Sequence, residues 1–132
     1  MKKLKIEILS PEGLVFSGEG NHVRAPGSNG DFGVLPDHAP FFTSLKLGRI
    51  SIDLDGSKTV LSVSGGYAEV LDNKISILAE SSELQENIDL ERAKLARDRA
   101  YERLNSGDTS IDIERARFSL MRALNRLSIV NH

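Results

Sequence analysis

Hydrophobic and polar residues alternate along the first two thirds of the chain. Aliphatic side chains occupy every second position of LKIEI at 4–8 and of ISIDL at 50–54. Alternation with a period of two residues is typical of a strand that has one buried face. Asp-Gly at 55–56 and Asp-Asn at 72–73 separate such runs, and these pairs tolerate the positive φ that tight hairpin turns need. The pattern predicts many short strands that form a β-sandwich or a small barrel.

Near residue 84 the hydrophobic period lengthens to three or four residues. No Gly or Pro occurs from 89 to 104, where strong helix formers dominate. An apolar stripe runs along one face of this helix. A second stripe runs along another helix, expected from about 112 to 128. The stripes consist of Leu90, Ala93, Ala96, Ala100 and Leu104 in the first helix, and of Ile113, Ala116, Leu120, Ala123 or Leu124, and Leu127 in the second.

The segment NSGDTS at 105–110 is typical of a loop, with Gly107 as a C-cap. Two helices joined by so short a loop are expected to pack antiparallel. Alanine in both stripes allows a close approach but buries little area, so the hairpin is expected to be only marginally stable alone. If the loop became extended or helical, the second helix would separate from the first, and the sequence permits both states.

A short repeat marks the start of both helices. IDLERA at 88–93 and IDIERA at 111–116 differ at one of six positions. Asp89 and Asp112 each suit an N-cap, because a carboxylate accepts hydrogen bonds from the orphan N–H groups of the first turn. The repeat therefore indicates two similar helix starts, or helix starts of which at least one also holds a ligand.

Composition excludes several classes of function. The formal net charge is -2, so no global basic field attracts nucleic acid. The absence of Cys excludes disulfides and thiol catalysis and argues against a zinc site. No stretch approaches the roughly 18 apolar residues of a membrane-spanning helix. No Walker-type loop or nucleophile motif occurs, and His22, His38 and His132 are scattered in the manner of structural or solvated residues.

Arginine is concentrated near the C-terminal end, where residues 115–132 contain four arginines and no acidic residue. A solvated helix end is the commoner interpretation, since cations near a helix C-terminus interact favourably with the helix dipole. The alternative is a surface that meets an acidic protein partner.

The arginines also share helix faces. Arg92 and Arg99 are seven residues apart, as are Arg115 and Arg122, and Arg126 lies one turn further on. Two such rows on facing helices can converge on one anion, and the planar guanidinium suits phosphate because it donates paired hydrogen bonds. Salt bridges are the competing interpretation, and the acidic residues within reach are Glu91, Asp98, Glu102 and Glu114. An enzyme acting on phosphorylated substrates would need a general base here, and Asp89 is the only nearby candidate.

Longer motifs resemble a known family. GDFGVLPDHAP at 30–40, SGGYAEV at 64–70 and RALNRLSIV at 122–130 resemble segments of the epsilon subunit of bacterial F-type ATP synthases, and the similarity covers essentially the whole chain. The resemblance implies a β + α fold. An N-terminal ten-stranded β-sandwich, residues 1–84, would precede a C-terminal two-helix antiparallel hairpin, residues 85–132.

The resemblance further implies a non-catalytic subunit of a rotor. The β-domain would bind the gamma subunit and the membrane-embedded c-ring, so that the chain is peripheral to the cytoplasmic face of the bacterial cell membrane. The helices would switch between the folded hairpin and an extended arm that enters the catalytic head and blocks ATP hydrolysis. In that state Arg115, Arg122 and Arg126 would face acidic segments of the catalytic beta subunits, with the alpha subunits adjoining.

Some members of this family bind ATP on the folded hairpin, as a regulatory ligand and not an obligatory cofactor. Their motif consists of Ile or Leu, Asp, two variable residues, Arg and Ala. The positions that match those of ATP-binding members are Glu83, Ile88, Asp89, Arg92, Ala93, Arg99, Arg122 and Arg126. The alternative is a β-sandwich adaptor whose helices form a constitutive coiled-coil contact with no nucleotide role.

Overall fold

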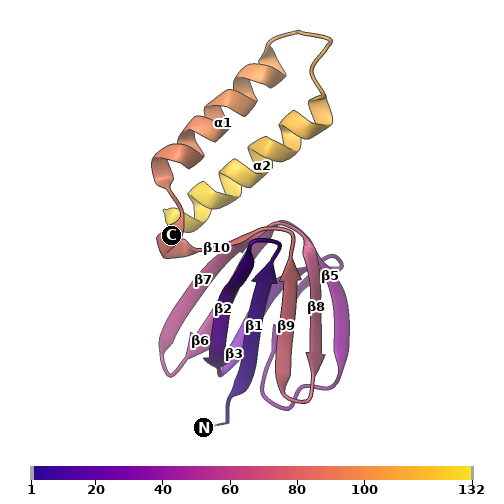
Figure 1. Cartoon of the computed structure of the whole chain (residues 1–132), viewed down its shortest axis with the longest axis vertical. Helices are drawn as coiled ribbons and strands as arrows, with labels where there is room; N and C mark the ends of the chain where they lie inside the picture. Colours follow the sequence, from indigo (N-terminus) through magenta and orange to yellow (C-terminus); the bar gives the residue numbers. More distant parts are fainter. Residues whose placement is uncertain (1, 132) are drawn as a thin grey trace. The chain divides into compact units, whose positions relative to one another are not determined.

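The computed structural model describes residues 2–131 and consists of two compact units that divide between Gln85 and Glu86 (Figure 1). The strands are β1 (Leu4–Ser10), β2 (Gly13–Gly20), β3 (His22–Gly27), β4 (Gly30–Val34), β5 (Phe41–Leu45), β6 (Gly48–Leu54), β7 (Ser57–Val63), β8 (Gly66–Leu71), β9 (Lys74–Ala79) and β10 (Ser82–Leu84). A 3₁₀ turn, η1 (Gln85–Asn87), is followed by the helices α1 (Leu90–Asn105) and α2 (Ile113–Val130). The predicted ten-stranded sandwich and two-helix antiparallel hairpin are confirmed. Met1 and His132 lie outside the described residues.

The ten strands form one sheet that folds over on itself. The strand order is β10-β7-β6-β3-β5-β8-β9-β1-β2, with β4 paired to β3 beside this path. In Figure 1, β1, β2, β8 and β9 form the layer nearest the viewer, and β3 and β6 lie behind them. The two layers join where β3 meets β5 through a single pair of residues, Gly27 and Leu45. All strand pairs are antiparallel except β1 and β9, which are parallel.

The alternating aliphatic residues of the sequence form the core between the layers. In the parallel pair, Ile6 is opposite Ile75 and Ile8 is opposite Ile77, and each of these four side chains is at most 1% exposed. Because side chains alternate across a strand, this register sends both sets of isoleucines inward together. The buried aliphatic residues of β3, β4, β5, β6, β7 and β8 belong to the same core.

Two of the predicted hairpin turns are observed as expected. Asp55 and Gly56 join β6 to β7 with φ of 49° and 88°, and Asp72 and Asn73 join β8 to β9 with φ of 51° and 59°. Positive φ at both central residues gives the turn a twist that matches the twist of the paired strands. The turn chemistry therefore sets the register of both hairpins.

The side chain of Asn73 also holds the segment between β4 and β5, at residues 35–40. Its Oδ1 accepts the backbone N–H of Asp37 at 2.9 Å, and its Nδ2 donates to the carbonyl of Lys3 at 2.8 Å. Asp37 itself has φ of 64°. A single turn residue thus ties the start of β1 to the segment between β4 and β5.

Both helices of the C-terminal unit begin in the same way. The carboxylate of Asp89 accepts the N–H of Arg92 at 3.1 Å, and that of Asp112 accepts the N–H of Arg115 at 3.1 Å. The two caps have nearly the same backbone angles, -81° and 107° against -76° and 100°. At the other end of α1, Ser106 is the C-cap, and Gly107, predicted to be the cap, follows it with φ of 71°. The prediction was one residue late, because the glycine takes the left-handed position just beyond the cap.

The predicted apolar stripes are largely, but not fully, buried. The helix interface is built mainly from Ala93 and Ala100 of α1 and from Ala116, Ala123 and Leu127 of α2. Ala123, and not Leu124, is the buried residue of that pair, since Leu124 is 41% exposed. Ile113 was expected in the stripe but is 54% exposed. It is the first residue of α2, so no preceding turn of the helix covers it. Ile129, fully buried, was missed.

We predict that Gly66→Ala strongly destabilises the N-terminal unit. A Cβ there would lie 2.1 Å from the carbonyl oxygen of Leu78, and Gly66 has φ of 121°. The expected loss is on the order of 3 kcal/mol, since both a steric clash and backbone strain are introduced. Urea unfolding followed by circular dichroism measures it. The matched control is Gly56→Ala, where φ is also positive but nothing lies within 4 Å of the new methyl group, so a loss of about 1 kcal/mol is expected. Equal losses in both variants would contradict the role of the close approach.

Candidate anion-binding groove

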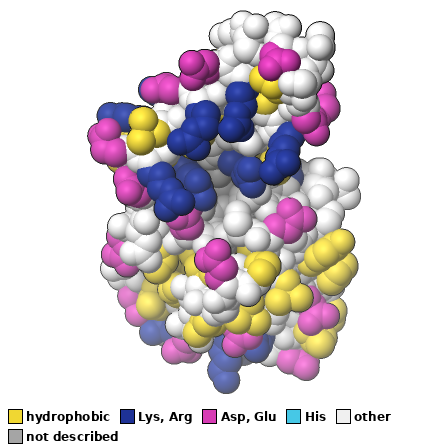
Figure 2. All heavy atoms as spheres, turned by 45° about the horizontal axis from the view of Figure 1, so that its top comes forward, with side chains coloured by type: hydrophobic (Ala, Val, Ile, Leu, Met, Phe, Trp, Pro, Cys, Tyr) yellow, Lys and Arg dark blue, Asp and Glu magenta, His cyan; other side chains and the backbone are white. Residues whose placement is uncertain are grey.

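Between α1 and α2 the hairpin encloses a groove of about 260 Å³. It is lined by Ala96, Arg99, Ala100 and Arg103 from α1 and by Ser119, Arg122, Ala123 and Arg126 from α2. Figure 2 shows Lys and Arg side chains gathered around a hollow over the helical unit. Each helix contributes two guanidinium groups, and small residues lie between them.

Helix geometry explains why these residues meet. Arg99 and Arg103 are one turn apart on α1, and Arg122 and Arg126 are one turn apart on α2, so each pair projects from one face. Alanine at the helix contact lets the two backbones approach closely, and the antiparallel packing brings residues 96–103 of α1 beside residues 119–126 of α2. Arg99, Arg122 and Arg126 were predicted from their spacing. Arg103 was missed, although its position four residues after Arg99 was a usable signal.

Two arginines of the predicted rows do not line the groove. Arg92 precedes Arg99 by seven residues, which is about 10 Å along a helix that rises about 1.5 Å per residue. Arg115 precedes Arg122 by the same number of residues, and it starts α2 beside the interhelical loop. Because the helices run in opposite directions, Arg92 and Arg115 lie toward opposite ends of the hairpin.

The remaining residues of the first repeat, IDLERA, build the helix. Ile88 is 8% exposed, Ala93 is 1% exposed, and the Asp89 carboxylate caps α1. In the second copy, Asp112 and Ala116 have the same roles, with a cap of the same length and an alanine 3% exposed. The shared letters of the repeat thus encode a repeated helix start. Glu83 belongs to β10, in the other unit, where its backbone N–H bonds the hydroxyl of Ser62 at 3.1 Å.

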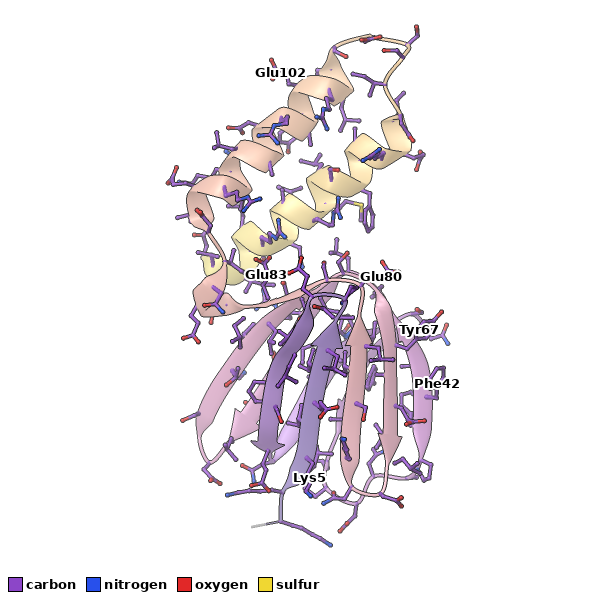
Figure 3. All side chains as sticks on the ribbon, in the orientation of Figure 1. Lys5, Phe42, Tyr67, Glu80, Glu83 and Glu102 are labelled. Atoms are coloured by element: carbon purple, nitrogen blue, oxygen red, sulfur yellow. The ribbon has the colours of Figure 1, made fainter. Side chains whose placement is uncertain are left out.

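Three acidic residues of the helices are paired with cations outside the groove. Glu91 pairs with Lys94 at 3.7 Å, Asp98 with Arg97 at 3.0 Å, and Glu114 with Arg117 at 3.1 Å. Glu102 projects from the side of α1 that faces away from α2 (Figure 3).

No ion pair within residues 2–131 involves Arg99, Arg103 or Arg122. The Cζ atom of Arg122 instead lies 5.0 Å from the centre of the Phe118 ring. Its Nη2 donates a hydrogen bond to the hydroxyl oxygen of Ser119 at 3.5 Å. The groove therefore brings like charges together, and an anion is the ligand that this arrangement suits.

The loop between the helices has its own hydrogen bonds. The Asp108 carboxylate accepts the backbone N–H of Ser110 at 2.9 Å and its hydroxyl at 2.7 Å. These two bonds favour the charged form and hold the pKa of Asp108 below its ordinary value. The hydroxyl of Ser106 donates to the carbonyl of Arg103 at 2.9 Å and accepts the N–H of Asp108 at 3.2 Å. The loop is thus an ordered turn that returns α2 alongside α1.

The described residues do not contain the elements of a metal site or of a membrane-spanning helix. Across residues 2–131, no cluster of His, Cys, Asp and Glu side chains could hold a metal ion. Neither described helix has the length and apolar character needed to cross a bilayer. Asp89, the candidate general base, is engaged as a helix cap.

Comparison with known proteins agrees with both units. Residues 3–85 match the family model described as the beta-sandwich domain of the ATP synthase delta/epsilon chain, and residues 86–131 match its long alpha-helix domain. The ATP synthase epsilon chain of Bacillus subtilis is 45% identical over 129 residues, which cover 98% of each chain. That of Desulforamulus reducens is 44% identical over 126 residues, which cover 96% of each chain.

Solved structures share the fold at low sequence identity. A chain of the Euglena gracilis mitochondrial ATP synthase, solved with OSCP, F1 and the c-ring, superimposes with a TM-score of 0.81 at 20% identity, covering 98% of this chain and 82% of that one. A chain of the central stalk and c-ring of the Tetrahymena thermophila enzyme gives 0.58 at 11% identity, covering 98% and 95%.

The fold and the groove define a class of protein in which a β-sandwich is joined to a two-helix hairpin with arginines of both helices around one groove. Within that class, the chain belongs to the ATP synthase delta/epsilon chain family, and its close relatives are epsilon chains.

We predict that the Asp108 carboxyl titrates below the ordinary Asp value of about 3.9. Because the folded pKa is lowered, the stabilisation of the loop is complete above the ordinary value and is lost as the pH falls through the folded pKa. Carbon-13 NMR of the carboxyl group measures the midpoint. Ser110→Ala removes the hydroxyl and keeps the backbone N–H, so its midpoint should rise only part of the way. A wild-type midpoint at or above the ordinary value would contradict this account.

Proposed function

We propose that this chain acts as a non-catalytic central-stalk subunit of the ATP synthase and that its helical hairpin senses ATP. The observation that carries the proposal is the groove, because half of its arginines come from each helix. The site is complete only while the helices lie side by side. A ligand held there stabilises the closed hairpin and no other state.

The control mechanism is then a population shift. A ligand that binds only the closed hairpin favours closure in proportion to its affinity and concentration. At a concentration one hundred times the Kd, the closed state gains about 2.7 kcal/mol. Such a gain is decisive for a hairpin whose buried contact is made mainly by alanine. ATP is the ligand we propose, as a regulator and not an obligatory cofactor, since the resemblance to ATP-binding family members includes Arg99, Arg122 and Arg126.

Falling ATP would release the arm. A continuous helix from residue 89 to residue 128 would be about 60 Å long at about 1.5 Å per residue, long enough to enter the catalytic head. Arg115, Arg122 and Arg126 would then face acidic segments of the catalytic beta and alpha subunits. Arg122 and Arg126 also line the groove, so each could contact either ATP or the catalytic head, but not both at once. Wasteful hydrolysis would be suppressed when ATP is scarce.

The N-terminal unit offers a surface for protein partners. Phe42 and Tyr67 stack on neighbouring strands, β5 and β8, with ring centres 5.8 Å apart, and they are 64% and 54% exposed (Figure 3). Leu78, opposite Tyr67 on β9, is 58% exposed and shares with it an apolar hollow of about 350 Å³. Exposed apolar side chains gathered in this way mark protein contacts.

We propose the gamma subunit and the c-ring as the partners of this unit. The structural neighbours come from assemblies described as containing the c-ring, and one of them is described as central stalk. Membrane association would then be indirect, through the complex, at the cytoplasmic face of the bacterial cell membrane.

We predict that the isolated chain binds ATP through the groove. In calorimetry, Arg122→Ala and Arg126→Ala should each weaken binding by on the order of tenfold to a hundredfold, the range expected for a lost charge-assisted hydrogen bond. The matched control is Arg117→Ala, which removes the same charge from α2 outside the groove, beside Glu114. Its Kd should stay within about threefold of wild type, since exposed ion pairs are weak. No heat from wild type with millimolar ATP would refute the proposal.

We predict separately that removing residues 88–132 raises ATP hydrolysis by the assembled complex, because the arm that blocks the head is gone. The rate is compared with that of complex carrying the full chain, at low and at high ATP. The difference should be larger at low ATP, where the arm is released. An unchanged hydrolysis rate at low ATP would refute the inhibitory role of the arm. It would not bear on the proposal that the hairpin binds ATP.

A further inference from the structure

The floor of the groove consists of small side chains. Ala96, Ala100 and Ala123 contribute only methyl groups, and Ser119 contributes a hydroxymethyl group. The arginines reach over this floor from both helices. The space for a ligand therefore exists because these positions are small. Leucine or methionine could fill such space, since their helix propensities are only slightly below that of alanine.

The three alanines are not equivalent. Ala100 is 2% exposed and Ala123 is 1% exposed, so both are enclosed where the helices touch. A larger side chain at either position would push the helices apart, as overpacking does. Ala96 is half-buried and lines the groove. A side chain that grows from Ala96 can extend into the hollow without entering the opposite helix.

Three of the four arginines at the groove have no ion pair among the residues described. Arg99, Arg103 and Arg122 meet around the hollow in this way, while Glu91, Asp98 and Glu114 pair with other cations. Without an anion, closure brings like charges together over a floor that offers little apolar contact. With an anion, the same charges become the main attraction between the helices.

We propose that Ala96 is the residue that makes closure of the hairpin depend on the ligand. This inference rests on the proposed ATP-sensing function. A large aliphatic side chain at position 96 would fill the hollow, add apolar contact between α1 and α2, and exclude the phosphate groups. The hairpin would then close without ATP and no longer respond to it.

The test uses the full chain with Ala96→Leu and Ala96→Met. Leu and Met are both strong helix formers, and Met is flexible enough to fill an irregular space. Asn105→Leu is the control, because it places the same leucine side chain at an exposed position of α1 outside the groove. Calorimetry measures ATP binding, and thermal unfolding followed by helical circular dichroism is recorded with and without ATP.

Wild type and Asn105→Leu should bind ATP alike, and ATP should raise their helix melting temperature. In at least one Ala96 variant, binding should weaken tenfold or more, the ligand-free melting temperature should rise, and the ATP-induced shift should disappear. Undiminished binding in both Ala96 variants would overturn the role of Ala96 and leave ATP sensing intact. A lower ligand-free melting temperature in both variants would also overturn it, since no usable space would then exist at that position. Absence of binding to wild type would refute the proposed function itself.

Discussion

The close contact between α1 and α2 at alanine is the constraint on which the rest of the hairpin depends. Small side chains such as those of Ala100 and Ala123 allow the helix backbones to come close enough for arginines of both helices to surround one hollow. Larger residues at the contact would separate the two rows. The same small residues leave the hairpin with little buried apolar area. The alanines that make room for the groove therefore also make the closed hairpin weak.

The local structure of each helix does not depend on that contact. Asp89 and Asp112 cap their own helices, and the Asp108 turn is closed by hydrogen bonds within the loop. Separating the helices would break the alanine contact and the groove while leaving both caps in place. Two helices that each have their own cap, with a weak contact between them, are the arrangement that the proposed ligand-dependent switch requires. The arginines fit that role because Arg99, Arg103 and Arg122 make no ion pair within residues 2–131.

The N-terminal unit has the opposite character. Its core is made of aliphatic side chains in matched register, and its turns fix that register with residues of positive φ. At Gly66 the backbone of β8 approaches that of β9 so closely that no side chain fits. Such a unit presents a fixed surface, and the stacked rings of Phe42 and Tyr67 lie on it. In the proposed function, a rigid docking unit and a weakly closed arm are complementary parts of a subunit that stays attached while its arm changes state.

Local patterns in the sequence determined the strands, the two turns, the helix starts and the arginine rows, because each depends on residues only a few positions apart. The repeat IDLERA and IDIERA belongs to this group, since a cap and its helix are local. Tertiary structure decided which rows meet. The antiparallel packing placed Arg103 in the groove and left Arg92 and Arg115 toward opposite ends. It also left Ile113 exposed. The parallel pairing of β1 with β9, which lie more than 60 residues apart, was equally invisible in the sequence. Periodicity identifies the face of an element, but only the packed chain determines what that face contacts.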